Sequence, residues 1–208
     1  MKLIGVRHFK STANDHPELV CGYQPDLRLS DNDPNRGQLS EGLKSFIERL
    51  FDSGQILEVV SSPAFRCLET ARLSLPEGLF PCAIDRRLAE VSQGEFEGKP
   101  RIEIYKPEIL NQINSEGDAF KPPGGESLIE ARERILLLYK EILARYKDKE
   151  GMVVLFGHGL VFKLLMSNLF ELDRNWVLNT EFPNGHYLNF DPNMKSDVPS
   201  ISSPTSVK

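Results

Sequence analysis

Short apolar runs alternate along the chain with stretches in which apolar side chains recur every three or four residues. Runs such as KLIGV, ILEVV, MVVLF and HYLNF have the length and residue types of buried strands. The stretch LKSFIERLF instead places its apolar residues on one face of a helix. Strands that alternate with helices indicate a mostly parallel central sheet with helices on both faces. We therefore predict a single α/β domain.

Capping residues mark where several of the predicted helices begin. Ser40 is placed to cap the first amphipathic helix, and Ser62 with Pro63 is placed to start the helix after the second strand. Ser127 and Glu130 have the spacing of a capping box. A long helix is predicted to follow that box.

Two segments depart from this alternation. Residues 91–125 are rich in Gly and Pro around a short amphipathic piece, and predict an insertion with one or two helices. Residues 192–208 are rich in Ser and Pro and lack apolar periodicity, so we expect a disordered tail. The folded domain is accordingly predicted to span residues 1–191.

Composition narrows the classes of function. A net charge of −5 over 208 residues makes nucleic acid an unexpected partner. Three widely spaced cysteines predict neither a disulfide framework nor a zinc site. The most apolar region is interrupted by His158 and Lys163, which is atypical of a membrane span, and no signal peptide is indicated. We expect a cytoplasmic protein, and nothing in the sequence indicates its oligomeric state.

Cationic side chains follow three of the predicted strands. Arg7 and His8 come directly after the first strand, Arg66 lies just past the second, and His158 follows a later one. Because the carboxyl ends of parallel strands meet at one edge of a sheet, we expect these groups to converge. Two guanidinium groups and two imidazoles form a site for a phosphate dianion.

Such a cluster predicts phosphoryl chemistry. A His among cations is kept neutral and can attack phosphorus, while a second His stabilises charge on the transferring oxygens. A leaving alkoxide needs a proton, and Glu90 is the carboxylate we favour as its source. Glu95 and Glu97 are close enough in the sequence to be alternatives.

An ordered set of motifs resembles the histidine phosphatase superfamily, which contains the cofactor-dependent phosphoglycerate mutases and related phosphatases. The motifs are the Arg-His pair followed by Ser11 and Asn14, SSPxxR with ETA behind it, LxE before GxFEG, PPGGES, and GHG after a strand. They extend from residue 3 to about residue 190. The spacing from GEFEG to PPGGES resembles the broad phosphatase branch, including alpha-ribazole phosphatase-like enzymes.

The resemblance implies specific roles. His8 would be the phosphoryl-accepting nucleophile and Glu90 the proton donor, with the remaining phosphate pocket formed by Arg7, Arg66 and His158. Asn14 matches a phosphate-pocket position, and Cys21 and Gly22 match a substrate-contacting segment. The resemblance implies no metal and no cofactor, and a small phosphorylated substrate.

Two residues depart from the family pattern, and two other functions stay open. Phe9 stands where Gly is usual, and Lys10 stands where an acidic residue is usual. One alternative is mutase-type phosphoryl transfer, and the other is a catalytically weak module that only binds a phosphorylated ligand. A metal site made of the two His and a carboxylate is disfavoured, because the two Arg would repel a dication.

Overall fold

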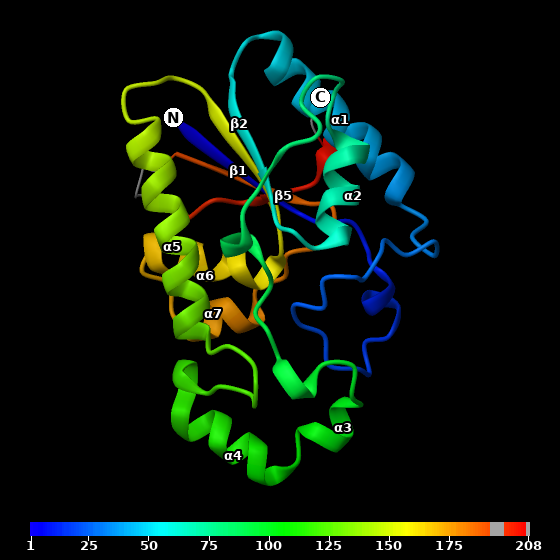
Figure 1. The fold of residues 1–208 in the computed structure, drawn as a ribbon, viewed down its shortest axis with the longest axis vertical. Coiled ribbons are helices and arrows are strands. Elements are labelled where there is room, and N and C mark those ends of the chain that lie inside the picture. Colours follow the sequence, from blue (N-terminus) through cyan, green and yellow to red (C-terminus); the bar gives the residue numbers. More distant parts are fainter. Residues whose placement is uncertain (192–197, 207–208) are drawn as a thin grey trace.

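Within residues 1–191 and 198–206, which the computed structural model describes, six strands form one sheet in the order β3-β2-β4-β1-β5-β6 (Figure 1). The strands are β1 (Lys2–Arg7), β2 (Ile56–Ser61), β3 (Ala83–Ile84), β4 (Met152–Gly157), β5 (Tyr187–Phe190) and β6 (Ile201–Ser202). The first four run parallel, while β5 is antiparallel to β1 and β6 to β5. The predicted α/β fold with a mostly parallel sheet is confirmed.

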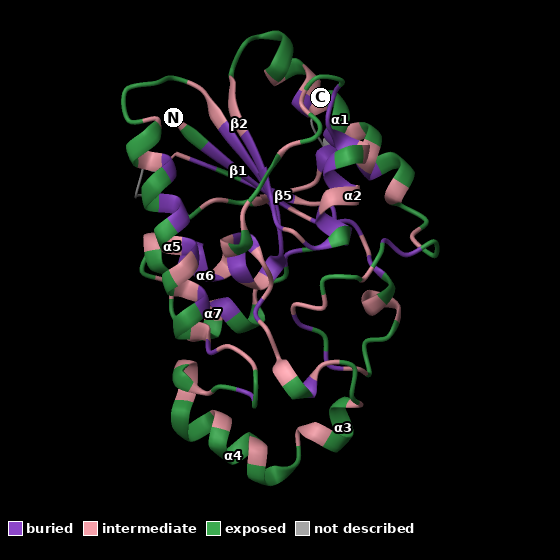
Figure 2. Ribbon diagram, in the orientation of Figure 1, coloured by how far each residue is buried: buried purple, intermediate pink, exposed green. Residues whose placement is uncertain are grey.

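Helices cover both faces of this sheet (Figure 1). One face carries α1 (Arg36–Asp52) and α2 (Phe65–Ser74), and the other carries α5 (Leu128–Arg145), α6 (Gly159–Leu169) and α7 (Arg174–Asn179). Successive strand residues point to opposite faces. Leu3 therefore packs with the α5 and α6 side chains, whereas Ile4 and Val6 pack with those of α1. Figure 2 shows the buried strands between two helical layers.

The predicted insertion lies beyond the carboxyl ends of the strands (Figure 1). It contains α3 (Arg101–Ile104) and α4 (Pro107–Glu116), with the 3-10 turns η3 (Gly94–Phe96) and η4 (Gly117–Ala119) beside them. No residue of α4 is buried. This part of the molecule is therefore held less by apolar packing than the sheet is.

The starts of the helices differ partly from the prediction. The capping box of Ser127 and Glu130 is confirmed, with Glu130 N–H donating to Ser127 Oγ at 3.2 Å. The expected cap at Ser40 is wrong, since α1 begins at Arg36 and Ser40 Oγ donates to a carbonyl inside the helix. The helix after β2 begins at Phe65 rather than Pro63, so Ser62 is free for another role.

The expectation of disorder from residue 192 is wrong for the described part of this segment. Ile201 and Ser202 form β6, which pairs with β5, and η5 (Pro204–Ser206) lies against α1. The reason is the open edge of β5, whose unpaired backbone groups accept another strand, while Ile201 packs on the core. The tail prediction for residues 192–197 and 207–208 falls outside the described residues.

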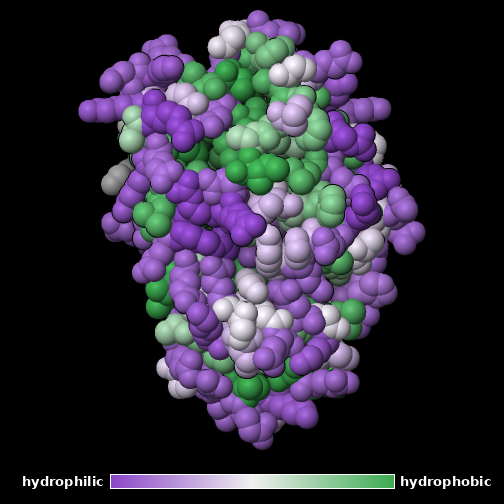
Figure 3. Space-filling model, in the orientation of Figure 1, coloured by the Kyte–Doolittle hydropathy of each residue, from purple (hydrophilic) through white to green (hydrophobic). Residues whose placement is uncertain are grey.

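The surface in Figure 3 carries hydrophobic side chains where β2 and the segment toward β3 lie. Phe80 of that segment and Ile84 of β3 are exposed. Among the described residues, no helix is long and apolar enough to cross a membrane.

Candidate active site

The strands that precede the predicted cationic groups are neighbours in the sheet, in the order β2, β4, β1. His8 follows β1 and His158 follows β4, and their rings meet edge to face with centroids 5.2 Å apart. Arg66, in the first turn of α2, places Nη2 3.3 Å from Nδ1 of His158. The structure therefore brings these three predicted residues together, because their segments leave the sheet at the same edge.

The ring of His8 is oriented by the backbone that follows it. Its Nδ1 lies 2.6 Å from the carbonyl oxygen of Phe9. A carbonyl only accepts, so Nδ1 carries the hydrogen of the neutral ring and Nε2 keeps its lone pair. Asn184 Nδ2 donates to the carbonyl oxygen of His8 at 3.0 Å and fixes the same turn. The nitrogen that faces away from this turn is the one suited to attack phosphorus.

Both imidazoles are held in their neutral form. Burial, followed by the charges of Arg66 and Arg7, lowers the pKa of His8 well below 6.5. Burial and then Arg66 and His8 lower the pKa of His158 in the same way. Each ring therefore has one unprotonated nitrogen at neutral pH.

His158 is fully buried and contacts two side chains of the segment that follows β2, one before α2 and one within it. Its Nε2 lies 3.0 Å from Ser62 Oγ and 3.4 Å from Cys67 Sγ. Arg66 Nη2 can only donate to Nδ1 of this ring, so Nε2 carries the hydrogen and donates it to Ser62 Oγ. Sequence reasoning assigned Ser62 to a helix cap and missed this contact.

Arg66 is wrapped by the loop that contains the predicted substrate segment. The guanidinium is 1% exposed, with Nη1 donating to Gln24 O at 2.7 Å and Nη2 to Gly22 O at 3.1 Å. Hydrogen bonds to two carbonyls fix the plane of the guanidinium. The remaining donors can then be presented to an anion in one orientation.

Arg7 has one buried donor to spare. Its Nη1 donates to the carbonyl oxygen of Phe182, whereas its Nε is buried and has no hydrogen-bond partner among the residues that the structure describes. Burial lowers the pKa of Arg7, and the charge of Glu90 opposes this effect. Buried donors without partners are rare, and an oxyanion would satisfy this one.

Cys21 and Gly22 lie in the loop around Arg66, although they differ in what they contribute. A Cβ on Gly22 would lie 2.8 Å from the backbone atoms Gln93 N and Val91 O, so only glycine permits the observed approach. Cys21 is exposed and lines a cavity of about 150 Å³ together with Gln24 and Leu27. Gly22 therefore shapes the loop through its backbone, whereas Cys21 presents its side chain at the surface.

Asn14 lies beside the turn that orients His8. Its Oδ1 accepts from Ser11 N–H at 2.9 Å and lies 3.5 Å from Asn184 Nδ2. The amide nitrogen of Asn14 is thus the end that is suited to a phosphate oxygen. The structure places Asn14 near the other predicted site residues, through Asn184.

The two departures from the family pattern have structural explanations. Phe9 is fully buried and packs in the core cluster that contains Leu39. Lys10 Nζ lies 2.7 Å from Asp15 Oδ1, so its charge is paired. Neither side chain takes the place of a residue in the cationic pocket.

Glu90 is the best placed of the three candidate acids. It is half-buried, its Oε1 accepts from Val91 N–H at 3.0 Å, and its charge acts on Arg7. Glu97 Oε1 instead accepts from the backbone N–H groups of the 22–24 loop and the 92–93 turn, each at 2.9 Å. Glu95 is exposed. Glu97 therefore joins two loops, which leaves Glu90 as the carboxylate beside the pocket.

Two further residues near the site were missed from the sequence. Asn184 contacts His8 across 176 positions of the chain, and its only local signal is a Pro-Asn-Gly turn before the last predicted strand. Lys163 Nζ donates to Thr180 O at 3.0 Å, and burial followed by Arg7 lowers its pKa. From the sequence, Lys163 is recognised only as a charged residue that interrupts an apolar run.

Comparison with known proteins identifies the family. The family model for the histidine phosphatase superfamily (branch 1) matches residues 3–196. The chain belongs to this family, which confirms both the predicted resemblance and the expectation of a phosphatase.

Two curated relatives are phosphatases of small molecules. A glucosyl-3-phosphoglycerate phosphatase of Mycolicibacterium vanbaalenii is 28% identical over 94% of this chain and 86% of the relative. A 5''-phosphoribostamycin phosphatase of Niallia circulans is 27% identical over 92% of this chain and 91% of the relative. The solved alpha-ribazole phosphatase of Shigella flexneri has a TM-score of 0.77 at 21% identity, covering 100% of this chain and 98% of that one. This last likeness shows the fold.

Proposed function

We propose that the protein hydrolyses a small phosphate monoester through a phosphohistidine formed on His8. The observation that carries the proposal is the neutral ring of His8, whose Nε2 keeps a lone pair beside the cationic groups of Arg7 and Arg66. Neutral imidazole is a nucleophile toward phosphorus, and two guanidinium groups stabilise the charge on the transferring oxygens. The phosphatase names of the relatives support the reaction class.

The proposed reaction has two steps. Nε2 of His8 attacks phosphorus, the bond from phosphorus to the leaving oxygen breaks, and Glu90 gives its proton to the departing alkoxide. Water then attacks the phosphohistidine and passes a proton to the Glu90 carboxylate, and the nitrogen–phosphorus bond breaks. Inorganic phosphate leaves and His8 returns to its neutral form. His158 stabilises charge in both steps.

Hydrolysis is favoured over mutase-type transfer by the charges of the insertion. Residues 101–121 contain three cationic and four acidic side chains. Lys121 Nζ lies 2.6 Å from Glu130 Oε1, and Arg101 Nε donates to Pro17 O at 3.0 Å. A mutase must shield its phosphoenzyme from water, and this segment has no surplus of cations with which to close over an anionic substrate.

The substrate that we propose is a phosphorylated hydroxyl compound of small size. Asn14 would contact the phosphate, and the loop of Cys21 and Gly22 would contact the rest of the molecule. Within the described part of the chain, no three His, Cys, Asp or Glu side chains gather closely enough to hold a metal ion. Metal independence and a cytoplasmic location stay predictions from the sequence.

Rapid quenching with substrate that carries a labelled phosphoryl group tests the proposal. We expect an acid-labile, base-stable adduct that maps to His8, together with release of inorganic phosphate. Label on a Ser, Asp or Cys would contradict the mechanism. Isomerisation of a phosphoglycerate without phosphate release would favour the mutase alternative. Binding of phosphate with no turnover of an aryl phosphate would favour the ligand-binding module.

A further inference from the structure

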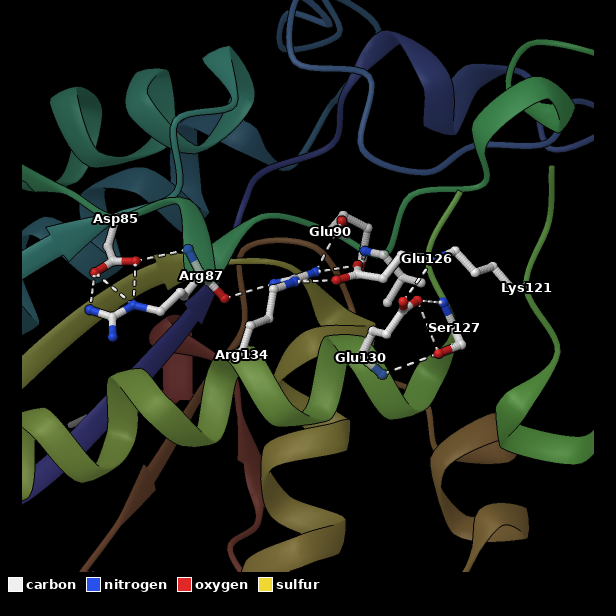
Figure 4. A network of polar contacts seen from close by, with 9 residues as sticks. Asp85, Arg87, Glu90, Lys121, Glu126, Ser127, Glu130 and Arg134 are labelled. Atoms are coloured by element: carbon white, nitrogen blue, oxygen red, sulfur yellow. Dashed lines mark hydrogen bonds and ion pairs between the residues drawn. The ribbon is translucent and has the colours of Figure 1, made fainter. Parts of the chain in front are cut away.

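One side chain of α5 contacts both ends of the short segment that carries Glu90. Arg134 Nη1 donates to the carbonyl oxygen of Arg87 at 2.7 Å, and its Nη2 donates to that of Glu90 at 3.3 Å. Figure 4 shows this guanidinium between the two carbonyls. One planar group therefore binds both ends of the segment 87–90 to α5.

The guanidinium is itself oriented by a carboxylate. Arg134 Nε lies 2.6 Å from Glu126 Oε1 and Nη2 lies 2.8 Å from Glu126 Oε2, which is a bidentate pair (Figure 4). Both side chains are 19% exposed, so the pair is only partly screened by water. Glu126 belongs to the PPGGES motif, which the proposed reaction does not use.

The same motif also holds the residues that follow Glu90. Glu126 N–H donates to the carbonyl oxygen of Ser92 at 2.9 Å. A Cβ on Gly125 would lie 2.7 Å from that oxygen, so glycine is required for the approach. Glu90 is thus attached to the start of α5 on both sides, by Arg134 before it and by the 125–126 backbone after it.

A second ion pair joins the beginning of the segment to the same helix. Arg87 Nη2 lies 2.7 Å from Asp85 Oδ2 and 2.7 Å from Glu141 Oε2. Arg87 and Arg134 each bind the segment of Glu90 to α5, and of the two only Arg134 contacts Glu90 itself.

We propose that Arg134, oriented by Glu126, is a positioning residue for Glu90. This inference rests on the proposed function, in which Glu90 protonates the leaving oxygen. A general acid must lie within hydrogen-bonding reach of that oxygen, and a displacement of about 1 Å can slow a reaction by up to ~100-fold. Arg134 holds the Glu90 backbone at the place from which its carboxyl group reaches the pocket.

The required chemistry is specific to arginine. One guanidinium serves two carbonyls and one carboxylate through a rigid fork of donors. A Lys at this position keeps the charge as a single point and cannot bridge both carbonyls. Arg134→Lys therefore tests geometry at constant charge, and Glu126→Gln tests the orienting partner.

The experiment compares two substrates that differ in their need for an acid. A nitrophenolate leaves without a proton, whereas an alkoxide needs one. We expect Arg134→Lys and Glu126→Gln to slow turnover of an alkyl phosphate about 10- to 100-fold while they leave nitrophenyl phosphate within about threefold. The matched control is Arg132→Gln, since Arg132 lies on the same helix and pairs with Asp118 at 2.6 Å. This control should not change the ratio of the two rates.

A double variant separates positioning from general structural damage. On the alkyl phosphate, Glu90→Gln with Arg134→Lys should be no slower than Glu90→Gln alone, because no acid is left to misplace. If Glu90→Gln discriminates between the substrates but neither Arg134→Lys nor Glu126→Gln does, the inference is wrong while the proposed function stands. If Glu90→Gln itself slows both substrates equally, the acid role fails, and the inference with it. Denaturation midpoints identify variants that fail to fold. If Arg134→Lys fails to fold, the Glu126→Gln variant alone decides the test.

Discussion

The cationic pocket at the strand ends and the segment of Glu90 are built in different ways. His8, Arg66 and His158 are 5%, 1% and 0% exposed, and each follows a strand or starts a helix of the central core. Glu90 is half-buried, and its position depends on hydrogen bonds from α5. The insertion beyond it contains α4, none of whose residues is buried (Figure 2).

This difference separates two parts of the proposed reaction. In the proposed reaction the pocket would bind the phosphoryl group, which every phosphate monoester shares, and the sheet register fixes the positions of its side chains. In the same proposal the Glu90 carboxyl group would face the leaving group, which differs from one substrate to the next. Substitutions in the pocket should therefore affect all substrates alike, whereas substitutions near Glu90 should affect them according to their leaving groups.

The largest effect is expected for His8→Ala. Turnover of alkyl and aryl phosphates should fall by several orders of magnitude, because no other side chain replaces the Nε2 nucleophile. The labelled adduct should also disappear. Steady-state rates with both substrates measure the loss, and His16→Ala at an exposed position provides the control. Retention of the adduct would place the nucleophile elsewhere.

The next effect is expected for the two residues that stabilise charge. Arg66→Gln and His158→Gln should each slow the chemical step by a factor of about 100 or more, or ~3 kcal/mol, since the first removes an oriented donor and the second removes the ring that contacts both Arg66 and His8. The loss should be similar for alkyl and nitrophenyl phosphates. Single-turnover rates measure it, with circular dichroism to verify folding. Near wild-type rates in either variant would place that residue outside the pocket.

A smaller and selective effect is expected for Glu90→Gln. Turnover of an alkyl phosphate should fall by about 100-fold, since proton transfer typically contributes that much, while nitrophenyl phosphate should change by only a few fold. Glu95→Gln, at an exposed position, should leave the ratio unchanged. Equal losses on both substrates would mean that Glu90 is not the acid and that the two regions do not differ as described.

The smallest effect concerns stability. The pKa values of His8 and His158 lie well below 6.5 in the folded protein, so below pH 6.5 the unfolded chain binds more protons. The free energy of unfolding should therefore fall as the pH decreases from 6.5, by up to ~1.4 kcal/mol per pH unit for each ring. Urea denaturation at several pH values measures this slope. A His158→Asn variant should have a shallower slope than the wild-type protein; identical slopes in the two proteins would contradict the buried, neutral state.

Much of the pocket could be predicted from the sequence because its parts depend on local patterns. A short apolar run followed by Arg7 and His8 indicates a strand end, and the same holds for His158. Parallel pairing then brings strand ends to one edge of the sheet, which is a general property of α/β proteins. The sequence alone therefore determined the fold class, the family and the cluster of cationic groups.

Only the tertiary structure decided which partners hold these groups. Asn184 contacts His8 across 176 positions, and Arg134 contacts the Glu90 carbonyl across 44. The pairing of Ile201 with the edge of β5 depends on an open strand that no local pattern reveals. Such contacts join segments that are distant in the sequence through a few hydrogen bonds each, and they leave no periodic signal in the chain. Their geometry is set by how the core packs, and so the sequence could not predict it.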